Sequence, residues 1–343
     1  KTMAAYNIYI LTSLFDKVAL TEGSFSDAPA LEPNFNSGKE VQAALIKMLE
    51  EVRALDAEQV ADDEAGNSTA GCDMILGGDV EAWLQFANTL YLKVLMRDFS
   101  ANKSKIEALL SEDNFLASDV KFAQFVNQAD KSNPLYESDR RQLNTTENIR
   151  CCTDILNILD PADPRLEYFY EGGATGAAYG TKGKQKETSR LAIEATDPVY
   201  FGTAAEALFL KAEAYARLGD AANAKTSYDA AVEESFSRCG ESDAAGAYLG
   251  EGGAYSFKSG STEDMVHQII NQKWASNVRC MPIESWFDIN RTGYPKRGTD
   301  ITLYTGVLEA PACRYLYPES SALYNRNSPQ VEPITAPMWW HRQ

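Results

Sequence analysis

The stretch Ala204–Ser235, AAEALFLKAEAYARLGDAANAKTSYDAAVEES, decides the fold because two helical patterns meet within it. Between the patterns, Gly219 can adopt the positive φ that ends a helix, and Asp220 can cap the next helix. Apolar residues three and four positions apart share one face of a helix. The residues that do so are Leu208, Ala212 and Tyr215 before the turn, and Ala224, Tyr228 and Ala231 after it. We expect these six residues to form one buried helix–helix interface.

Helix pairs of this kind occur in tetratricopeptide repeats, although Lys211 replaces an expected apolar residue and Phe236 replaces the usual closing Pro. One such pair cannot bury its outer face alone, so the chain should contain further amphipathic helices. Their patterns run over Thr2–Val18, Gly38–Leu55, Gly77–Ser100 with Asp79 as its cap, Ser104–Leu110, Ile149–Leu159 and Glu263–Trp274. The sequence therefore predicts a mostly α fold with few short strands.

Composition sets broad limits on function. Of the 343 residues, 44% are hydrophobic, as in a globular protein. The 32 basic and 49 acidic residues give a formal net charge of −17, which disfavours binding to nucleic acid or to an anionic membrane surface. No apolar run reaches the roughly 20 residues that span a bilayer. Because the chain lacks an initiator Met and opens inside a helical pattern, we expect that an N-terminal part is missing.

The sequence carries no signature of an enzyme. It has only two histidines, His267 and His341, and it has no G-x-S-x-G, H-E-x-x-H or G-x-x-x-x-G-K-[ST] motif. Its six cysteines show no metal-binding spacing, so we predict no metal site, no cofactor and no catalytic residue. Carboxylates are numerous enough that a pair suited to glycoside hydrolysis can arise by chance, which leaves that alternative open.

Long segments rich in glycine and other turn formers separate the predicted helices, namely Thr21–Ser37, Gly172–Gly180 and Gly240–Gly260. Tyrosine occurs 17 times, often in such segments. Sugars offer apolar C–H faces to aromatic rings and hydroxyl groups to polar side chains. Aromatic loops on a rigid helical scaffold therefore favour a sugar-binding protein.

Five parts of the chain carry a resemblance to a known family. They are GGDVEAWLQFANTLYLKVLMR (77–97), ADPRLEYFY (162–170), AEALFLKAEAYARLGD (205–220), IINQKWASNVRCMPIESWFDINRTGYP (269–295) and RYLYPESSALYNRN (314–327), with MWW (338–340) after them. In this order they resemble the SusD/RagB family, the surface-exposed nutrient-binding lipoproteins of Bacteroidetes outer membranes. The fourth segment departs from the family signature, because Ser285 replaces an Ala and Asn290 replaces an Arg.

The resemblance implies one SusD-like domain over residues 1–343, with tetratricopeptide-like helix pairs such as 204–235 and long loops gathered into a second, discontinuous layer. It implies no catalysis. It implies capture of an oligosaccharide at the cell surface by a lipid-anchored outer-membrane protein, and delivery to a SusC-like TonB-dependent transporter. Two alternatives remain, a peptide-binding member of the family and a tetratricopeptide adaptor for protein partners. An adaptor should show regular repeats of about 34 residues with short turns.

The residues of the binding site are predicted from loop aromatics. Tyr170 and Tyr179 flank the glycine-rich loop, and Tyr200 and Phe201 follow after only about 20 residues, so the two segments should face each other across one groove. Tyr136, before the charged run Asp139-Arg140-Arg141, is a fifth candidate. The next candidates are Tyr248 and Tyr255, whereas Trp83, Trp274 and Trp286 on helix faces should be core residues.

Overall fold

The computed structural model describes residues 1–23, 26, 29–55, 71–142, 148–179, 181, 186–301 and 311–342. Its helices are α1 (Thr2–Phe15), α2 (Gly38–Arg53), α4 (Val80–Leu95), α5 (Phe99–Glu112), α6 (Pro134–Tyr136), α7 (Thr153–Ile158), α8 (Arg165–Phe169), α9 (Ala204–Leu218), α10 (Ala221–Arg238), α11 (Ala245–Leu249), α12 (Thr262–Ser276), α13 (Pro282–Thr292) and α14 (Glu319–Tyr324). The short turns are η2 (Met96–Asp98), η3 (Glu137–Gln142) and η4 (Ser242–Ala244). The strands are β1 (Val120–Phe122), β2 (Tyr170–Glu171), β3 (Arg190–Leu191) and β4 (Val199–Gly202), paired antiparallel as β1–β4 and β2–β3. Within these residues, no helix combines the length and apolar character needed to cross a bilayer.

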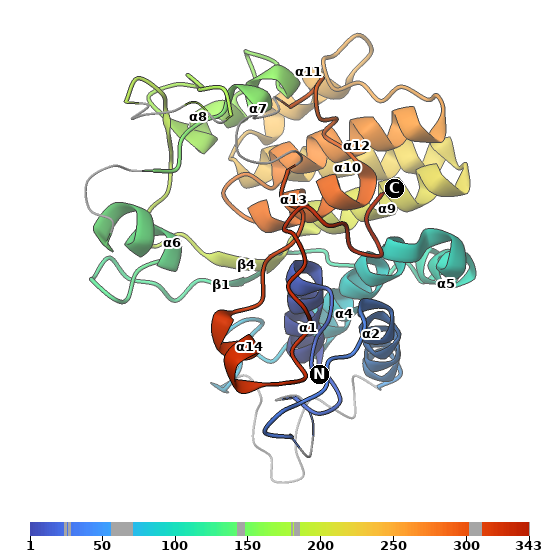
Figure 1. Cartoon of the computed structure of the whole chain (residues 1–343). Coiled ribbons are helices and arrows are strands. Elements are labelled where there is room, and N and C mark those ends of the chain that lie inside the picture. Colours follow the sequence, from blue (N-terminus) through green and yellow to red (C-terminus); the bar gives the residue numbers. More distant parts are fainter. Residues whose placement is uncertain are drawn as a thin grey trace.

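The predicted helix pair is α9 and α10, which lie side by side in Figure 1. Gly219 ends α9 with a φ of 83°, and the carboxylate of Asp220 accepts a hydrogen bond of 3.0 Å from the backbone N–H of Asn223. Ala224 is fully buried, as the predicted interface requires, whereas two of the six predicted residues, Leu208 and Tyr215, are only half-buried. The helix-pair prediction is therefore confirmed.

The first half of the chain packs α1, α2, α4 and α5 together, in the lower part of Figure 1. In the predicted helix Thr2–Val18, the apolar residues Met3, Tyr6 and Ile10 are half-buried and pack against the edge of this core. Ala5 and Ile8 on another face are fully buried instead. Since α1 has no charged residue, its periodicity could not show which side faces the core.

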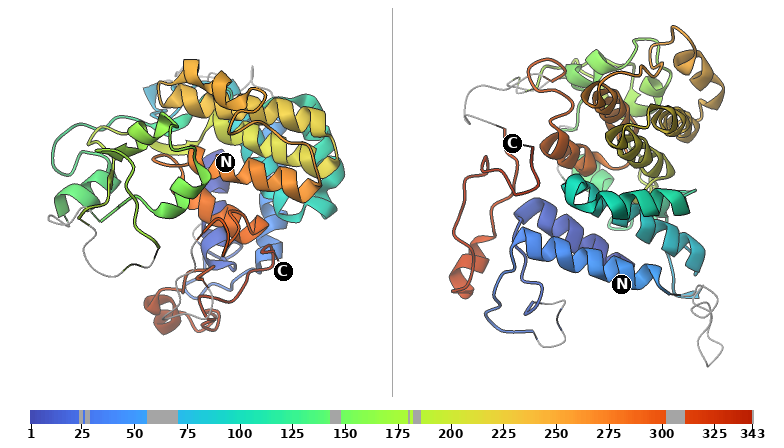
Figure 2. Two further views of the ribbon diagram at one scale, coloured as in Figure 1. Left: turned by 90° about the horizontal axis from the view of Figure 1, so that it is seen from above. Right: turned by 90° about the vertical axis from the view of Figure 1, so that its right-hand side faces the viewer.

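Buried apolar side chains form two clusters that meet at α9. The first cluster joins α1, α2, α4 and α5 to Ala207, Leu210 and Ala214 of α9. The second joins α10 and α12 to Phe209 and Ala212 of the same helix. The right-hand view of Figure 2 shows the helices stacked in successive layers, with α10 and α12 above α1 and α2. A helix that is apolar on opposite faces belongs in the interior, and α9 is the interior wall between the two cores.

The described residues of the segment 120–202, called the loop layer here, lie mainly beside the helices on the left of Figure 1. The predicted helix Ile149–Leu159 is shorter than expected, because Arg150 and Cys152 form β-bridges to Arg190 and Ala177 and only Thr153–Ile158 is helical. Two other boundaries also differ from the prediction. α5 extends beyond Ser104–Leu110, and the segment 240–260 contains η4 and α11.

Replacing Ala224 with leucine should destabilise the protein by ~1–3 kcal/mol, because extra methylene groups cannot fit into a packed helix interface. Urea unfolding measures the change in free energy. Ala222→Leu is the matched control, since Ala222 lies exposed on the same helix and its replacement should cost less than about 0.5 kcal/mol. Equal effects of the two substitutions would contradict the close packing of α9 on α10.

Candidate functional site

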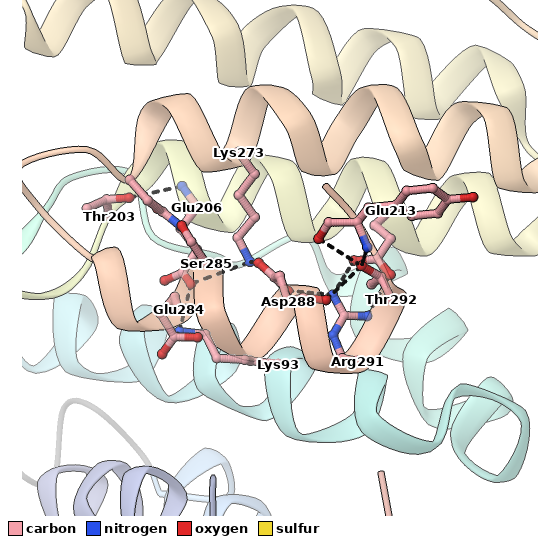
Figure 3. Close-up of polar contacts among 12 residues, drawn as sticks. Lys93, Thr203, Glu206, Glu213, Lys273, Glu284, Ser285, Asp288, Arg291 and Thr292 are labelled. Atoms are coloured by element: carbon pink, nitrogen blue, oxygen red, sulfur yellow. Dashed lines mark hydrogen bonds and ion pairs between the residues drawn. The ribbon is translucent and has the colours of Figure 1, made fainter. Parts of the chain in front are cut away.

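Charged side chains from α4, α9, α12 and α13 meet in the interior, as Figure 3 shows. The ammonium group of Lys93 lies 2.8 Å from Glu206 and 3.1 Å from Glu284. A second lysine, Lys273, lies 2.8 Å from Asp288 and 3.6 Å from Glu206. These ion pairs connect the helices of the two cores, and we call them the interhelix network.

The interhelix network continues to a bidentate pair between Arg291 and Glu213. The two guanidinium nitrogens donate to the two carboxylate oxygens at 2.6 and 2.7 Å, the geometry of a strong charge-assisted pair. Burial raises the pKa of Glu213, but Arg291 and Arg217 outweigh it and lower that pKa below its usual range. Burial likewise lowers the pKa of Lys93, but Glu206 and Glu284 outweigh it and hold that pKa well above its usual value. The charges of this network therefore stabilise each other.

The network is a structural element rather than a ligand site. Glu206 and Glu284 could resemble the carboxylate pair of a glycoside hydrolase, but their residues are only 1% and 2% exposed. Several members, Lys273, Glu284 and Arg291, belong to the segment 269–295 that resembles the family signature. The signature residues of this chain thus hold helices together. Among the described residues, no group of His, Cys, Asp and Glu side chains is arranged to hold a metal ion.

A polar cavity of about 450 Å³ opens in the loop layer and is the candidate ligand site. We call it the loop-layer cavity. It combines a half-buried aromatic ring with an amide, two guanidinium groups and two carboxylates. Its lining residues are Asn127, Tyr136, Arg140, Glu171, Arg190, Ile193, Glu194, Ala195 and Thr196. This set can stack on one face of a ligand and exchange hydrogen bonds with its hydroxyl groups.

Local sequence fixes the aromatic wall of the cavity. Pro134 starts α6 at a position that needs no N–H donor, and the side chain of Asn133 accepts hydrogen bonds from the N–H groups of Leu135 and Tyr136 at 2.8 and 3.1 Å. The backbone N–H of Asn133 donates to the carbonyl of Ala195 at 2.8 Å. Tyr136 is thereby held beside the opposite wall. The π-helical turn η3 follows it directly, and such turns are frequent at functional sites.

The guanidinium groups of the cavity are held by strand pairing. Arg140 pairs with Asp139 at 2.7 Å and donates to the carbonyl of Leu191 at 2.5 Å. Glu171 on β2 lies opposite Arg190 on β3, and the two side chains form an ion pair. Glu171 also lies 3.5 Å from Arg140. The cavity floor is therefore a linked group of charges contributed by η3, β2 and β3.

The structure separates the five predicted aromatic residues. Only Tyr136 lines the loop-layer cavity. Tyr170 is 6% exposed and belongs to the second core, so its ring packs in the interior and not on a loop surface. Tyr179 is 63% exposed, and residues 180 and 182–185 of its loop lie outside the described part of the chain. The ligand-binding role of these residues stays a prediction.

Tyr200 and Phe201 are also placed differently from the prediction. Both are half-buried on β4, where the ring of Tyr200 lies near Lys121 and that of Phe201 meets the ring of Tyr6 edge to face, with 5.7 Å between centroids. The lining of the loop-layer cavity includes neither of them nor Tyr170 and Tyr179. The groove expected between the two segments stays a prediction, and the loop-layer cavity is the candidate that the described residues offer.

The reserve candidates Tyr248 and Tyr255 have a structural role. Their rings stack with 5.2 Å between centroids, and the hydroxyl of Tyr255 donates to the carboxylate of Asp163 at 2.6 Å. The hydroxyl of Tyr248 donates to the carbonyl of Ala162 at 2.6 Å. They therefore fix the Asp-Pro-Arg turn, residues 163–165.

Sequence reasoning missed Glu171 and Arg190 as site residues. The charged run at Asp139-Arg140-Arg141 was the visible signal for one wall of the cavity. The pairing of β2 with β3 brings Glu171 and Arg190, which are 19 residues apart, to the other wall of the cavity. Strands of two residues are too short to show the alternation of apolar and polar residues that would predict them.

Two other hollows share Ile283 of α13 and are mainly apolar. One of about 490 Å³ is lined by Tyr6, Asn7, Ile10, Leu11 and Ile283, and one of about 560 Å³ by Ile283, Trp286, Ala312, Arg314, Tyr315, Leu316 and Ile334. Since these hollows offer few hydrogen-bonding groups, the loop-layer cavity suits a hydroxyl-rich ligand better.

Trp83, Trp274 and Trp286 pack against the cores as predicted but stay half-buried.

Known structures share this fold. A SusD homologue from Bacteroides uniformis aligns with a TM-score of 0.78 at 22% identity, over 100% of this chain and 81% of that one. A homologue from Bacteroides ovatus gives 0.79 at 20% identity, covering 100% and 82%. A chitin-binding SusD homologue from Flavobacterium johnsoniae gives 0.77 at 20% identity, covering 99% and 80%. These likenesses confirm the mostly α fold with tetratricopeptide-like pairs.

Sequence comparison identifies the family. No curated protein matches the chain. The model of a SusD-like family, described as starch-binding and associating with the outer membrane, matches residues 1–318. Since this match spans most of the chain, as does the structural likeness, the protein belongs to the SusD-like family.

Proposed function

We propose that this protein binds an oligosaccharide in the loop-layer cavity and acts without catalysis. The observation that carries the proposal is a half-buried tyrosine ring beside paired donors and acceptors in a hollow of about 450 Å³. Tyr136 would stack on the apolar face of a sugar ring. Asn127, Arg140 and Glu171 would exchange hydrogen bonds with its hydroxyl groups.

The family description and one structural neighbour suggest which glycans to test. The family is described as starch-binding, and the homologue from Flavobacterium johnsoniae binds chitin. Both polymers consist of uncharged pyranose units, so maltohexaose and chitohexaose are the first ligands to examine. Peptide binding, the alternative within the family, is tested with a peptide panel in the same assay.

The proposal extends to location and partner. We place the protein at the cell surface, attached to the outer membrane by a lipid anchor, as one SusD-like domain that delivers its ligand to a SusC-like TonB-dependent transporter. The match to a family that associates with the outer membrane supports this. A tetratricopeptide adaptor is disfavoured, because long irregular segments interrupt the helix pairs. Purification from native outer membranes without any large β-barrel protein would contradict the transporter partner.

Tyr136→Ala should weaken binding of the preferred glycan at least about threefold, since an aromatic contact contributes ~0.5–1.5 kcal/mol beyond buried area. Isothermal titration calorimetry measures the affinity under conditions where the variant is folded, since the ring of Tyr136 also packs against the second core and its loss should lower the unfolding midpoint. Tyr324→Ala is the control, because Tyr324 is exposed on α14 and does not line the cavity. If Tyr179→Ala weakens binding and Tyr136→Ala does not, the site lies on the glycine-rich loop instead.

A further inference from the structure

Glu171 neutralises both guanidinium groups of the loop-layer cavity. Its carboxylate lies 3.5 Å from Arg140 and forms an ion pair with Arg190, the residue opposite it in the β2–β3 pair. Arg140 has a second carboxylate partner, Asp139, at 2.7 Å. Glu194 also lines the cavity and has no ion pair within the described residues. Among the described lining residues, two carboxylates thus match two guanidinium groups in number, and the carboxylate of Glu194 is not paired with either arginine.

A ligand carboxylate would need a guanidinium group that is free to receive it, preferably in a bidentate pair. In this cavity the arginines already pair with the carboxylate of Glu171. The carboxylate of a ligand would therefore be repelled by the negative charges of Glu171 and Glu194. Specificity is commonly achieved through such a repulsive element against the wrong ligand. Hydroxyl groups face no such barrier, because they can donate to Glu171.

We infer that Glu171 determines the specificity of this site by excluding acidic sugars, so that the ligand class is the uncharged oligosaccharides. The inference rests on the proposed function and adds a residue to it. The position of Glu171 supports this role. It is half-buried at the cavity wall, while its neighbour Tyr170 points into the core, as alternation along a strand requires.

Glu171→Gln tests the inference, because glutamine keeps the shape of the side chain and removes its charge. Arg140 retains Asp139 as a partner, and the side chain of Arg190 is 38% exposed, so water can solvate it and the fold should persist. With the charge of Glu171 removed, the carboxylate of a uronic acid should meet less repulsion beside the two arginines. We expect the affinity for tetragalacturonate to rise at least about tenfold, as a hydrogen bond to a charged group contributes enough for that factor.

Glu167→Gln is the matched control, because it changes the net charge equally from an exposed position on α8 that does not line the cavity. Wild type and both variants are titrated with maltohexaose, chitohexaose and tetragalacturonate at low and high salt. A gain confined to Glu171→Gln and weakened by salt supports the inference. Equal gains in both variants, no gain, or tight galacturonate binding by the wild type would overturn it. Neutral-glycan binding that is unaffected by Tyr136→Ala would instead overturn the proposed site itself.

Discussion

Replacing Lys93 with methionine should lower the free energy of unfolding by about 3–5 kcal/mol, as removal of one partner from a buried ion pair leaves uncompensated charge. Lys93 contacts Glu206 and Glu284, and all three are buried between the two cores. Methionine fills a similar volume, so the loss should reflect charge rather than a cavity. Urea unfolding at neutral pH measures it.

The pH dependence of this variant provides a second measurement. Burial raises the pKa of Glu284 in the native protein, and Lys93 is the strongest influence that opposes this rise. Without Lys93, the pKa of Glu284 in the folded state should rise further above its value in the unfolded chain, which is about 4.3. The folded state then binds more protons than the unfolded state, so stability increases as the pH falls. The difference between Lys93→Met and wild type should therefore shrink on mild acidification.

Two controls separate charge from packing in this experiment. Lys105 pairs with Glu50 at 2.7 Å on the surface, so Lys105→Met should cost only about 0–1 kcal/mol. Adding Glu206→Gln and Glu284→Gln to Lys93→Met should restore part of the lost stability, because no buried charge then lacks its partner. If Lys93→Met costs no more than Lys105→Met, the interhelix network does not join the two cores.

Replacing Arg165 with methionine should cost a similar ~3–5 kcal/mol and should also weaken glycan binding. Arg165 is 0% exposed, and its guanidinium donates to Asp163 at 2.7 Å, to Ser235 at 2.9 Å and to Gln272 at 3.1 Å. It thus attaches the loop layer to α10 and α12. Since α8 begins at Arg165 and leads into β2, loosening this turn should displace Glu171 from the cavity.

Arg165→Lys distinguishes geometry from charge, because lysine keeps the positive charge but cannot form the planar, multidentate contacts. The free energy of unfolding of Arg165→Lys should therefore fall nearly as far below the wild-type value as that of Arg165→Met. Arg326 pairs with Glu32 on the surface, so Arg326→Met is the control for loss of a positive charge and should cost about 0–1 kcal/mol. Unfolding curves and glycan titrations of the three variants complete the experiment. Wild-type affinity in a destabilised Arg165→Met protein would show that the cavity does not depend on this turn.

Features that depend on neighbours along the chain could be predicted from the amino-acid sequence. Helical spacing, the glycine at position 219 and the caps at Asp79 and Asp220 act within one or two turns of a helix, so they could be read directly. The matching segments also indicated the SusD-like family, because their order and spacing are sequence properties. These local signals were sufficient for the mostly α fold and for its central helix pair.

The residues that line the candidate cavity became visible in the tertiary structure alone. Successive residues of a strand point to opposite faces, so the placement of β2 sends Tyr170 into the core and leaves Glu171 at the cavity. The charged residues of the signature gave no sign of their partners either, since Lys93 and Glu284 approach from helices far apart in the sequence. Exposure and ion pairing depend on packing between distant segments, and neither composition nor periodicity records which segments will meet.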